Sequence, residues 1–160
     1  MKRIFIGIGT NLGDREVNLK KAVMLIEEHM GPVKIASSVY ETEPWGFQSK
    51  NNFLNMVVEA ETRLSPSGLL GRALMIESLL GRLREGKAYK SRIIDIDILL
   101  YNNRIIKKKV LVIPHPLMHE RKFVLVPLCE IAGNLIHPVF GKSIRELLEA
   151  CPDKSKVIKY

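Results

Sequence analysis

Asp95 and Asp97, two acidic residues separated by Ile96, are the clearest candidates for chemistry in this chain. The surrounding residues 93–101 are rich in isoleucine and leucine and predict a strand, in which alternate side chains share a face. Both carboxylates then lie on one face, with their Cα atoms about 6.6 Å apart. At that separation they repel by roughly 2 to 3 kcal/mol if the effective dielectric constant is about 20. A divalent cation between them would reverse this repulsion. The alternative is an edge strand with a solvated acidic face.

A cluster of basic residues immediately precedes the two aspartates, with only Glu85 as an opposing charge. Arginine suits phosphate oxygens because its guanidinium group donates two parallel hydrogen bonds. Carboxylates for Mg²⁺ and arginines for phosphate are together the parts of a phosphoryl transfer that involves a nucleotide. The alternative is a solvated basic loop without a ligand. The basic residues are Arg82, Arg84, Lys87, Lys90 and Arg92.

Two further polar residues stand at unusual places. Glu77 lies at the border of the apolar stripe of a helix predicted over residues 65–83, where an unpaired carboxylate costs free energy. It either faces the aspartate pair, supporting a metal or a water, or reaches solvent. His115 stands between Pro114 and Pro116, which restrict its backbone. A histidine held in this way could bind a phosphate, and the alternative is a turn histidine without a role.

Residues 53–62 predict a second strand with two different faces. Its apolar alternate residues form the core face, so Phe53 and Asn55 share the opposite face. A flat heterocycle needs an aromatic ring to stack on and an amide to read its edge. Trp45 and Phe123 are candidates for further stacking. For each aromatic residue the alternative is ordinary packing.

Size and composition narrow the class of protein. The chain has 160 residues, of which 46% are hydrophobic and 26% charged, so we expect a single globular domain over residues 1–160. No apolar run approaches the roughly 18 residues that a membrane span requires. Two isolated cysteines, Cys129 and Cys151, indicate a reducing, cytoplasmic location. The formal net charge of +8 fits a plain basic surface, a small polyanion such as ATP, or a nucleic acid.

The elements that must position these residues follow in the order strand, helix, strand, strand, helix, strand. This order suggests a mainly antiparallel α+β sandwich with helices on one face, which leaves the other face for the site. Residues 84–91 predict a loop, and the tail from residue 116 predicts loops and short helices. Strands are predicted over residues 3–9, 33–43, 53–62, 93–101 and 110–113, and helices over 14–30, 65–83 and 143–150.

The ordered set of motifs resembles the hydroxymethyldihydropterin pyrophosphokinase family over nearly the full chain. The resemblance implies a ferredoxin-like fold with a C-terminal extension. It also implies transfer of pyrophosphate from ATP to the hydroxymethyl group of 6-hydroxymethyl-7,8-dihydropterin in folate biosynthesis, with AMP released. The matching pieces are Gly9-Thr10-Asn11-Leu12-Gly13, Tyr40-Glu41-Thr42-Glu43-Pro44, Phe53-Leu54-Asn55, Glu77, Gly81-Arg82, Arg84, residues 92–98, Pro114-His115-Pro116, Arg121 and Phe123.

The resemblance also implies roles for individual residues. Asp95 and Asp97 would hold two Mg²⁺ ions, and Asp97 is the nearest candidate to help deprotonate the hydroxyl. Arg82 and Arg92 would neutralise charge that develops on the phosphates. The co-substrate ATP would be bound by Glu77, Arg84, Ile98, His115 and Arg121, and the pterin by Thr42, Trp45, Phe53, Asn55 and Phe123.

Some positions depart from the family pattern. Ala88, Lys90 and Ser91 differ from the residues common there, and they fall in a predicted lid over residues 84–91. Leu74 stands where relatives can have a polar nucleotide contact. We expect a monomer that binds neither nucleic acid nor membrane. One alternative is a ferredoxin-like RNA-binding module, which would not need two carboxylates on a ligand face. The other is a related Mg²⁺-dependent transferase with a different acceptor.

Overall fold

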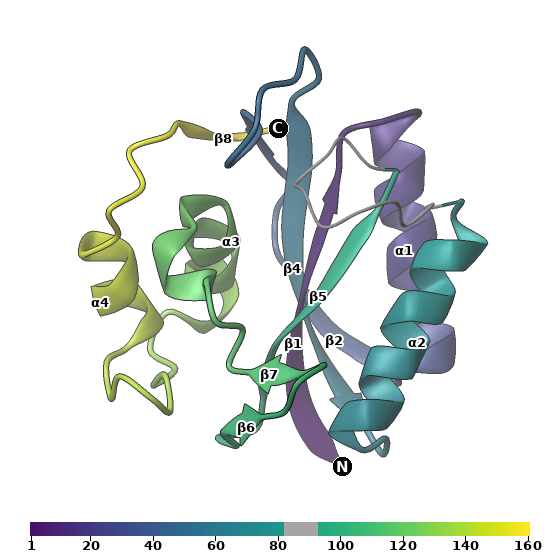
Figure 1. The fold of residues 1–160 in the computed structure, drawn as a ribbon, viewed down its shortest axis with the longest axis vertical. Helices are drawn as coiled ribbons and strands as arrows, with labels where there is room; N and C mark the ends of the chain where they lie inside the picture. The colour runs from purple at the N-terminus through teal and green to yellow at the C-terminus, as the bar shows by residue number, and fades with distance from the viewer. Residues whose placement is uncertain (82–92) are drawn as a thin grey trace.

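The structure is a computed structural model that describes residues 1–81 and 93–160. The predictions for Arg82, Arg84 and Arg92, and for the lid over residues 84–91, lie outside the described residues. Within them the chain forms a central sheet with helices on both faces (Figure 1).

Within the described residues, six antiparallel strands make up the main sheet, in the order β5-β1-β4-β3-β8, with β2 also paired to β4. The single strand predicted over residues 33–43 is in fact two, because β2 and β3 pair with successive parts of β4. The strand β8 was not predicted. The strands are β1 (Lys2–Thr10), β2 (Val33–Ala36), β3 (Tyr40–Thr42), β4 (Phe53–Thr62), β5 (Asp95–Tyr101) and β8 (Val157–Lys159).

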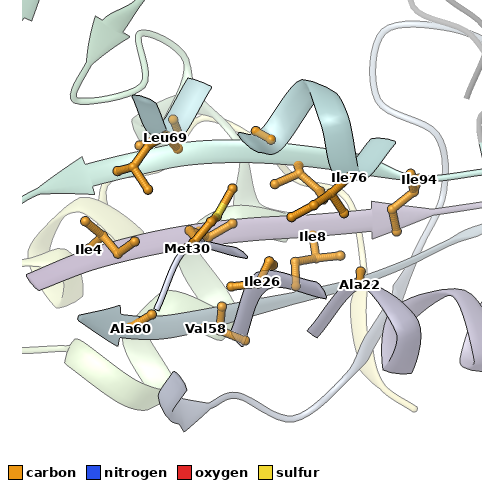
Figure 2. Packing of buried hydrophobic residues seen from close by; sticks show 14 of the residues in the cluster. Ile4, Ile8, Ala22, Ile26, Met30, Val58, Ala60, Leu69, Ile76 and Ile94 are labelled. Atoms are coloured by element: carbon orange, nitrogen blue, oxygen red, sulfur yellow. The ribbon is translucent and has the colours of Figure 1, made fainter. Parts of the chain in front are cut away.

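Two helices, α1 (Arg15–His29) and α2 (Pro66–Leu79), cover one face of the sheet. Both begin at the predicted residues, where Asp14 and Ser65 accept hydrogen bonds from backbone N–H groups of the first turn. Alternate residues of β1 and β4 point toward these helices and form the larger core, as Figure 2 shows. The opposite residues of the same strands are therefore available for a second face.

The second face is partly covered by α3 (Lys122–Ala132), and α4 (Ile144–Glu149) packs against α3 on the side away from the sheet (Figure 1). The two helices make up the C-terminal extension. Loops and short helices were predicted here, and the long helix α3 was missed because Pro127 stands inside it and proline lacks an N–H donor. Burial of Val124, Leu125 and Leu128 against the sheet outweighs that cost. The site can therefore occupy only the part of this face that α3 leaves open.

A turn at Asn102, with a φ of 48°, leads from β5 into a small two-stranded sheet of β6 (Ile106–Lys107) and β7 (Val112–Ile113). A 3₁₀ helix, Met118–Glu120, then leads into α3. The mainly antiparallel α+β fold is as predicted. No helix among residues 1–81 and 93–160 has the length and apolar character to span a membrane.

Candidate active site

A cleft of about 710 Å³ lies over the part of the second face that α3 leaves open. Its volume falls in the range of small-molecule sites. It runs from the loop after β3, across β4, β1 and β5, and around the side of β5 that faces away from β1 to α2. It brings together the predicted site residues that the structure describes: Thr42, Trp45, Phe53, Asn55, Glu77, Asp95, Asp97, Ile98, His115, Arg121 and Phe123.

The floor of the cleft is built from residues that face one another across three strands. Gly9 of β1 pairs with Asn55 of β4 on one side and with Asp95 of β5 on the other. Gly7 pairs in the same way with Asp97. Sequence reasoning missed the two glycines as part of the site. The available signal was their alternation with Ile6 and Ile8, which places both glycines on the face opposite the isoleucines, the site face.

Asp95 and Asp97 are half-buried on this floor, whereas Ile96 between them points into the larger core. Glu77 of α2 is only 1% exposed, and its Oε1 accepts a hydrogen bond of 2.9 Å from the backbone N–H of Ile96. The alternative in which Glu77 reaches solvent is therefore wrong. Among the residues that the structure describes, β5 is the last strand on its side of the sheet, so this bond satisfies a backbone donor that no described strand reaches. It also fixes the strand at the point between the two carboxylates.

At the β4 end of the cleft, Asn55 is 5% exposed and donates from Nδ2 to Thr42 Oγ1 over 2.8 Å. The neighbouring Phe53 packs edge to face with Phe47, with ring centroids 6.1 Å apart. Phe47 also lines the cleft, and it was not among the predicted residues. An aromatic residue two positions after Trp45, in the same loop, was the signal for it.

Arg121 joins the aromatic and the charged parts of the cleft. Its guanidinium carbon lies 4.7 Å from the centre of the Trp45 ring and 5.7 Å from that of Phe123. Such contacts stabilise a buried guanidinium, and Arg121 is only 6% exposed. The residues predicted to frame the pterin and the arginine predicted for the phosphates are thus direct neighbours.

His115 is held on both sides of its ring. Its Nδ1 accepts a hydrogen bond from the backbone N–H of Leu117, and its Nε2 lies 4.0 Å from Asp97 Oδ1. Burial, and after it the charge of Arg121, lowers the pKa of His115 to about 4, with Asp95 opposing the shift. The ring is therefore neutral near pH 7, with its hydrogen on Nε2. Its contact with Asp97 is then not an ion pair.

Beyond the edge of β5 the cleft becomes apolar. This part is lined by the α2 residues Leu70, Ala73 and Leu74 and by residues 110–112, which precede and begin β7, with Lys109 as a charged neighbour. Leu74, where a polar contact is possible in relatives, is 40% exposed. The cleft thus has an aromatic and amide end, an acidic middle and an apolar end.

The chain is similar to proteins of known activity over most of its length. A family model described as 7,8-dihydro-6-hydroxymethylpterin-pyrophosphokinase (HPPK) matches residues 5–133. The 2-amino-4-hydroxy-6-hydroxymethyldihydropteridine pyrophosphokinase of Aquifex aeolicus is 42% identical over 146 residues, which cover 91% of this chain and 90% of that protein. A protein of the same name from Bacillus subtilis is 47% identical over 132 residues, which cover 82% and 78%.

The fold is similar to that of solved structures. A crystal structure of wild-type Plasmodium falciparum HPPK-DHPS with pteroate matches with a TM-score of 0.78 at 17% identity. The match covers 93% of this chain and 44% of that chain, so this chain spans less than half of the solved protein. The likeness confirms the predicted ferredoxin-like fold.

Proposed function

The chain belongs to the 7,8-dihydro-6-hydroxymethylpterin-pyrophosphokinase family, and on this premise we propose that the cleft is its active site. The reaction transfers pyrophosphate from ATP to the hydroxymethyl group of 6-hydroxymethyl-7,8-dihydropterin and releases AMP, a step of folate biosynthesis. The observation that carries the assignment of the cleft is the row of Asn55, Gly9 and Asp95 across three strands. The Cα atoms of Asn55 and Asp95 therefore lie about 10 Å apart, which is two strand spacings, with Gly9 between them.

The aromatic and amide end binds the pterin in this proposal. Asn55 offers both a donor and an acceptor to the ring edge, and its bond to Thr42 orients the amide. Phe53 and Phe123 line the same end and supply ring faces for stacking. Trp45 closes this end through its contact with Arg121. The hydroxymethyl group then points along the floor toward the acidic middle.

The chemistry takes place over β5. The hydroxymethyl oxygen forms a bond to the β-phosphorus of ATP while the bond from that phosphorus to the oxygen bridging the α-phosphate breaks. That oxygen leaves with AMP. The hydroxyl proton passes to a base, and Asp97 is the proposed candidate for this base. Such a transfer requires mainly positioning and charge stabilisation. The proposed roles of Arg82 and Arg92 in neutralising phosphate charge belong to residues that the structure does not describe.

The Asp95 and Asp97 pair fits Mg²⁺. Within the described residues, no group of three or more His, Cys, Asp or Glu side chains could hold a metal ion. Two half-buried carboxylates on one strand face nonetheless match the usual mode for Mg²⁺, which takes one or two carboxylates together with water and substrate phosphates. When bound there, two Mg²⁺ ions would supply charge neutralisation and orientation of the phosphates.

The apolar end binds the nucleoside of ATP in this proposal. Ile98 and Leu74 line that end, and Glu77 stands where the cleft turns around β5. His115 and Arg121 lie toward the acidic middle, within reach of phosphates. Arg84 is also proposed for ATP but falls outside the described residues. We propose further that residues 1–160 act as a single domain and a monomer in the cytoplasm, without nucleic acid or membrane.

The proposed activity is tested by the release of AMP. Purified protein is mixed with ATP, Mg²⁺ and 6-hydroxymethyl-7,8-dihydropterin, and AMP is measured over time. The control acceptor is 6-methyl-7,8-dihydropterin, which has the same ring but no attacking oxygen. We expect AMP only with the hydroxymethyl compound. Release of AMP at equal rates with both compounds, or with neither, would contradict the proposal.

A further inference from the structure

We infer that Gly9 is a specificity-determining residue. Because Gly9 has no side chain, the Asn55 amide has room to lie where it hydrogen-bonds to the edge of the pterin. The inference rests on the proposed function of the cleft and adds a residue to it. Gly9 has no side chain with which to bind a ligand, so it acts as a positioning residue through Asn55.

A side chain at position 9 would clash with Asn55. A Cβ atom added at Gly9 would lie 2.9 Å from Asn55 Oδ1 and 3.7 Å from Phe53 Cδ1. The shorter distance is below normal contact, so one of the two groups would have to move. The backbone does not require glycine here, since the φ of Gly9 lies outside the left-handed region that favours it. The space taken by the Asn55 amide is therefore the constraint on this position.

Asn55 has little freedom to move away from such a side chain. Its side chain is 5% exposed, and its Nδ2 donates to Thr42, which is itself only 3% exposed. Rotating the amide away from a methyl group at position 9 would break this bond in a buried environment. A buried polar group that loses its partner costs free energy, so the amide cannot yield cheaply. An alanine at position 9 would therefore displace the Asn55 amide from the position in which it binds the pterin.

A second glycine on the same strand face provides a comparison. Gly7 also lines the cleft, two residues away on β1, but a Cβ atom there would lie 3.5 Å from Leu99 Cδ2, an ordinary contact. The two positions differ in what covers them, since Gly9 lies beneath a polar side chain and Gly7 beside an apolar one. An alanine adds the same methyl group at each position, but only the methyl group at position 9 would clash with a polar side chain.

The test is a set of binding measurements by titration calorimetry, with 6-hydroxymethylpterin in the presence of Mg²⁺ and a saturating non-hydrolysable ATP analogue. Gly9→Ala should weaken pterin binding by about 10- to 100-fold, the loss expected for one or two displaced hydrogen bonds. Binding of the ATP analogue alone should change by less than about twofold. Gly7→Ala should cost clearly less pterin affinity than Gly9→Ala. Gly71→Ala, at an exposed helix position with nothing within 4 Å, is the control for glycine replacement.

A double-mutant cycle tests whether Gly9 acts through Asn55. In an Asn55→Ala background the clash is removed, so Gly9→Ala should cost no further pterin affinity beyond about twofold. An equal loss in both backgrounds would overturn the inference, because the methyl group would then act directly on the ligand. Wild-type pterin affinity in Gly9→Ala would also overturn it. If Gly9→Ala does not fold, the double variant should regain the Tm of the Asn55→Ala single variant, and failure to regain it would contradict the inference.

These outcomes are separable from failure of the proposed function. If the wild-type protein binds the ATP analogue but no pterin, the proposed function fails whatever Gly9 does. If the wild-type protein binds pterin and Gly9→Ala binds it equally well, only the role of Gly9 fails.

Discussion

Glu77 Oε1 accepts a hydrogen bond of 2.9 Å from the backbone N–H of Ile96, the residue between the two aspartates of the cleft. The carboxylate reaches β5 from α2, on the side of the strand that faces away from β1. A buried acidic side chain is thereby used to hold the backbone that carries Asp95 and Asp97. The contact links the helix layer to the acidic middle of the cleft.

This contact predicts that Glu77→Leu and Glu77→Gln behave differently. Leucine leaves the Ile96 N–H without its acceptor, so the free energy of unfolding should fall by about 1–3 kcal/mol. Turnover should also require more Mg²⁺, since the two carboxylates lose their support. Glutamine keeps an acceptor oxygen and should retain most of the stability. Urea unfolding and Mg²⁺ titrations of turnover measure the two effects, and a Leu variant as stable as the Gln variant would refute the structural role.

Neutralising either aspartate should abolish turnover without unfolding the protein. Asp95→Asn and Asp97→Asn each remove a charge from a half-buried floor and open no cavity in the core. We expect turnover to fall by at least about 1,000-fold, since several kcal/mol of charge stabilisation are lost. The Tm should be unchanged or higher. Glu61→Gln, which neutralises a surface carboxylate on β4, is the matched control. Near-normal activity of either Asn variant at ordinary Mg²⁺ would mean that the metal assignment is wrong.

Replacing Asn55 should separate the two substrates. Asn55→Leu leaves the pterin edge without hydrogen-bond partners, which costs about 1–3 kcal/mol for each group. Pterin affinity should fall at least about tenfold while ATP affinity stays within about twofold. Thr42→Val, which removes only the partner of the Asn55 amide, should give a smaller loss of the same kind. Calorimetric titrations with each ligand measure this, and an equal loss for both ligands would indicate misfolding rather than lost recognition.

The free energy of unfolding should decrease below neutral pH because of His137. This residue is 2% exposed, and its Nδ1 accepts hydrogen bonds from the backbone N–H groups of Val139 and Phe140. Burial, and after it the charge of His119, lowers the pKa of His137 from 6.5 to about 4. The unfolded chain therefore binds the proton more readily. The contribution of His137 to the free energy of unfolding is fully present above pH 6.5. It is lost as the pH falls from 6.5 to 4, by up to about 3 kcal/mol.

The variant His137→Asn tests this origin, because its side-chain oxygen can accept the same two bonds and does not titrate. Urea unfolding at pH 7 and pH 4.5 should show a smaller decrease for the variant than for the wild-type protein. Part of the decrease should remain, since burial also lowers the pKa of His115. An unchanged decrease in the variant would assign the effect to other groups.

Much of the site could be predicted because alternation along a strand decides which side chains share a face. Asp95 with Asp97, and Phe53 with Asn55, are pairs of this kind, and both pairs line the cleft. What alternation does not supply is the register between strands. The position of Asn55 over Gly9 follows from the pairing of β1 with β4, which no local pattern specifies.

Other features depend on contacts between distant elements. The partner of Glu77 is a backbone group on another element, so its burial could not be read from helical periodicity. The contact of Arg121 with Trp45 joins a loop to the start of α3. The helix α3 was not predicted at its full length, because Pro127 lowers the local helix propensity. Burial of its apolar residues stabilises the helix in the folded protein.

In the proposed mechanism, the cleft directs the pterin hydroxyl to the β-phosphorus of ATP. The most direct test is a ³¹P NMR spectrum of a reaction of the wild-type protein with ATP, Mg²⁺ and 6-hydroxymethyl-7,8-dihydropterin. Attack at the β-phosphorus predicts AMP and a pterin diphosphate ester in equal amounts, with no ADP. Formation of ADP with a pterin monophosphate, or loss of ATP without any phosphorus on the pterin, would contradict the account.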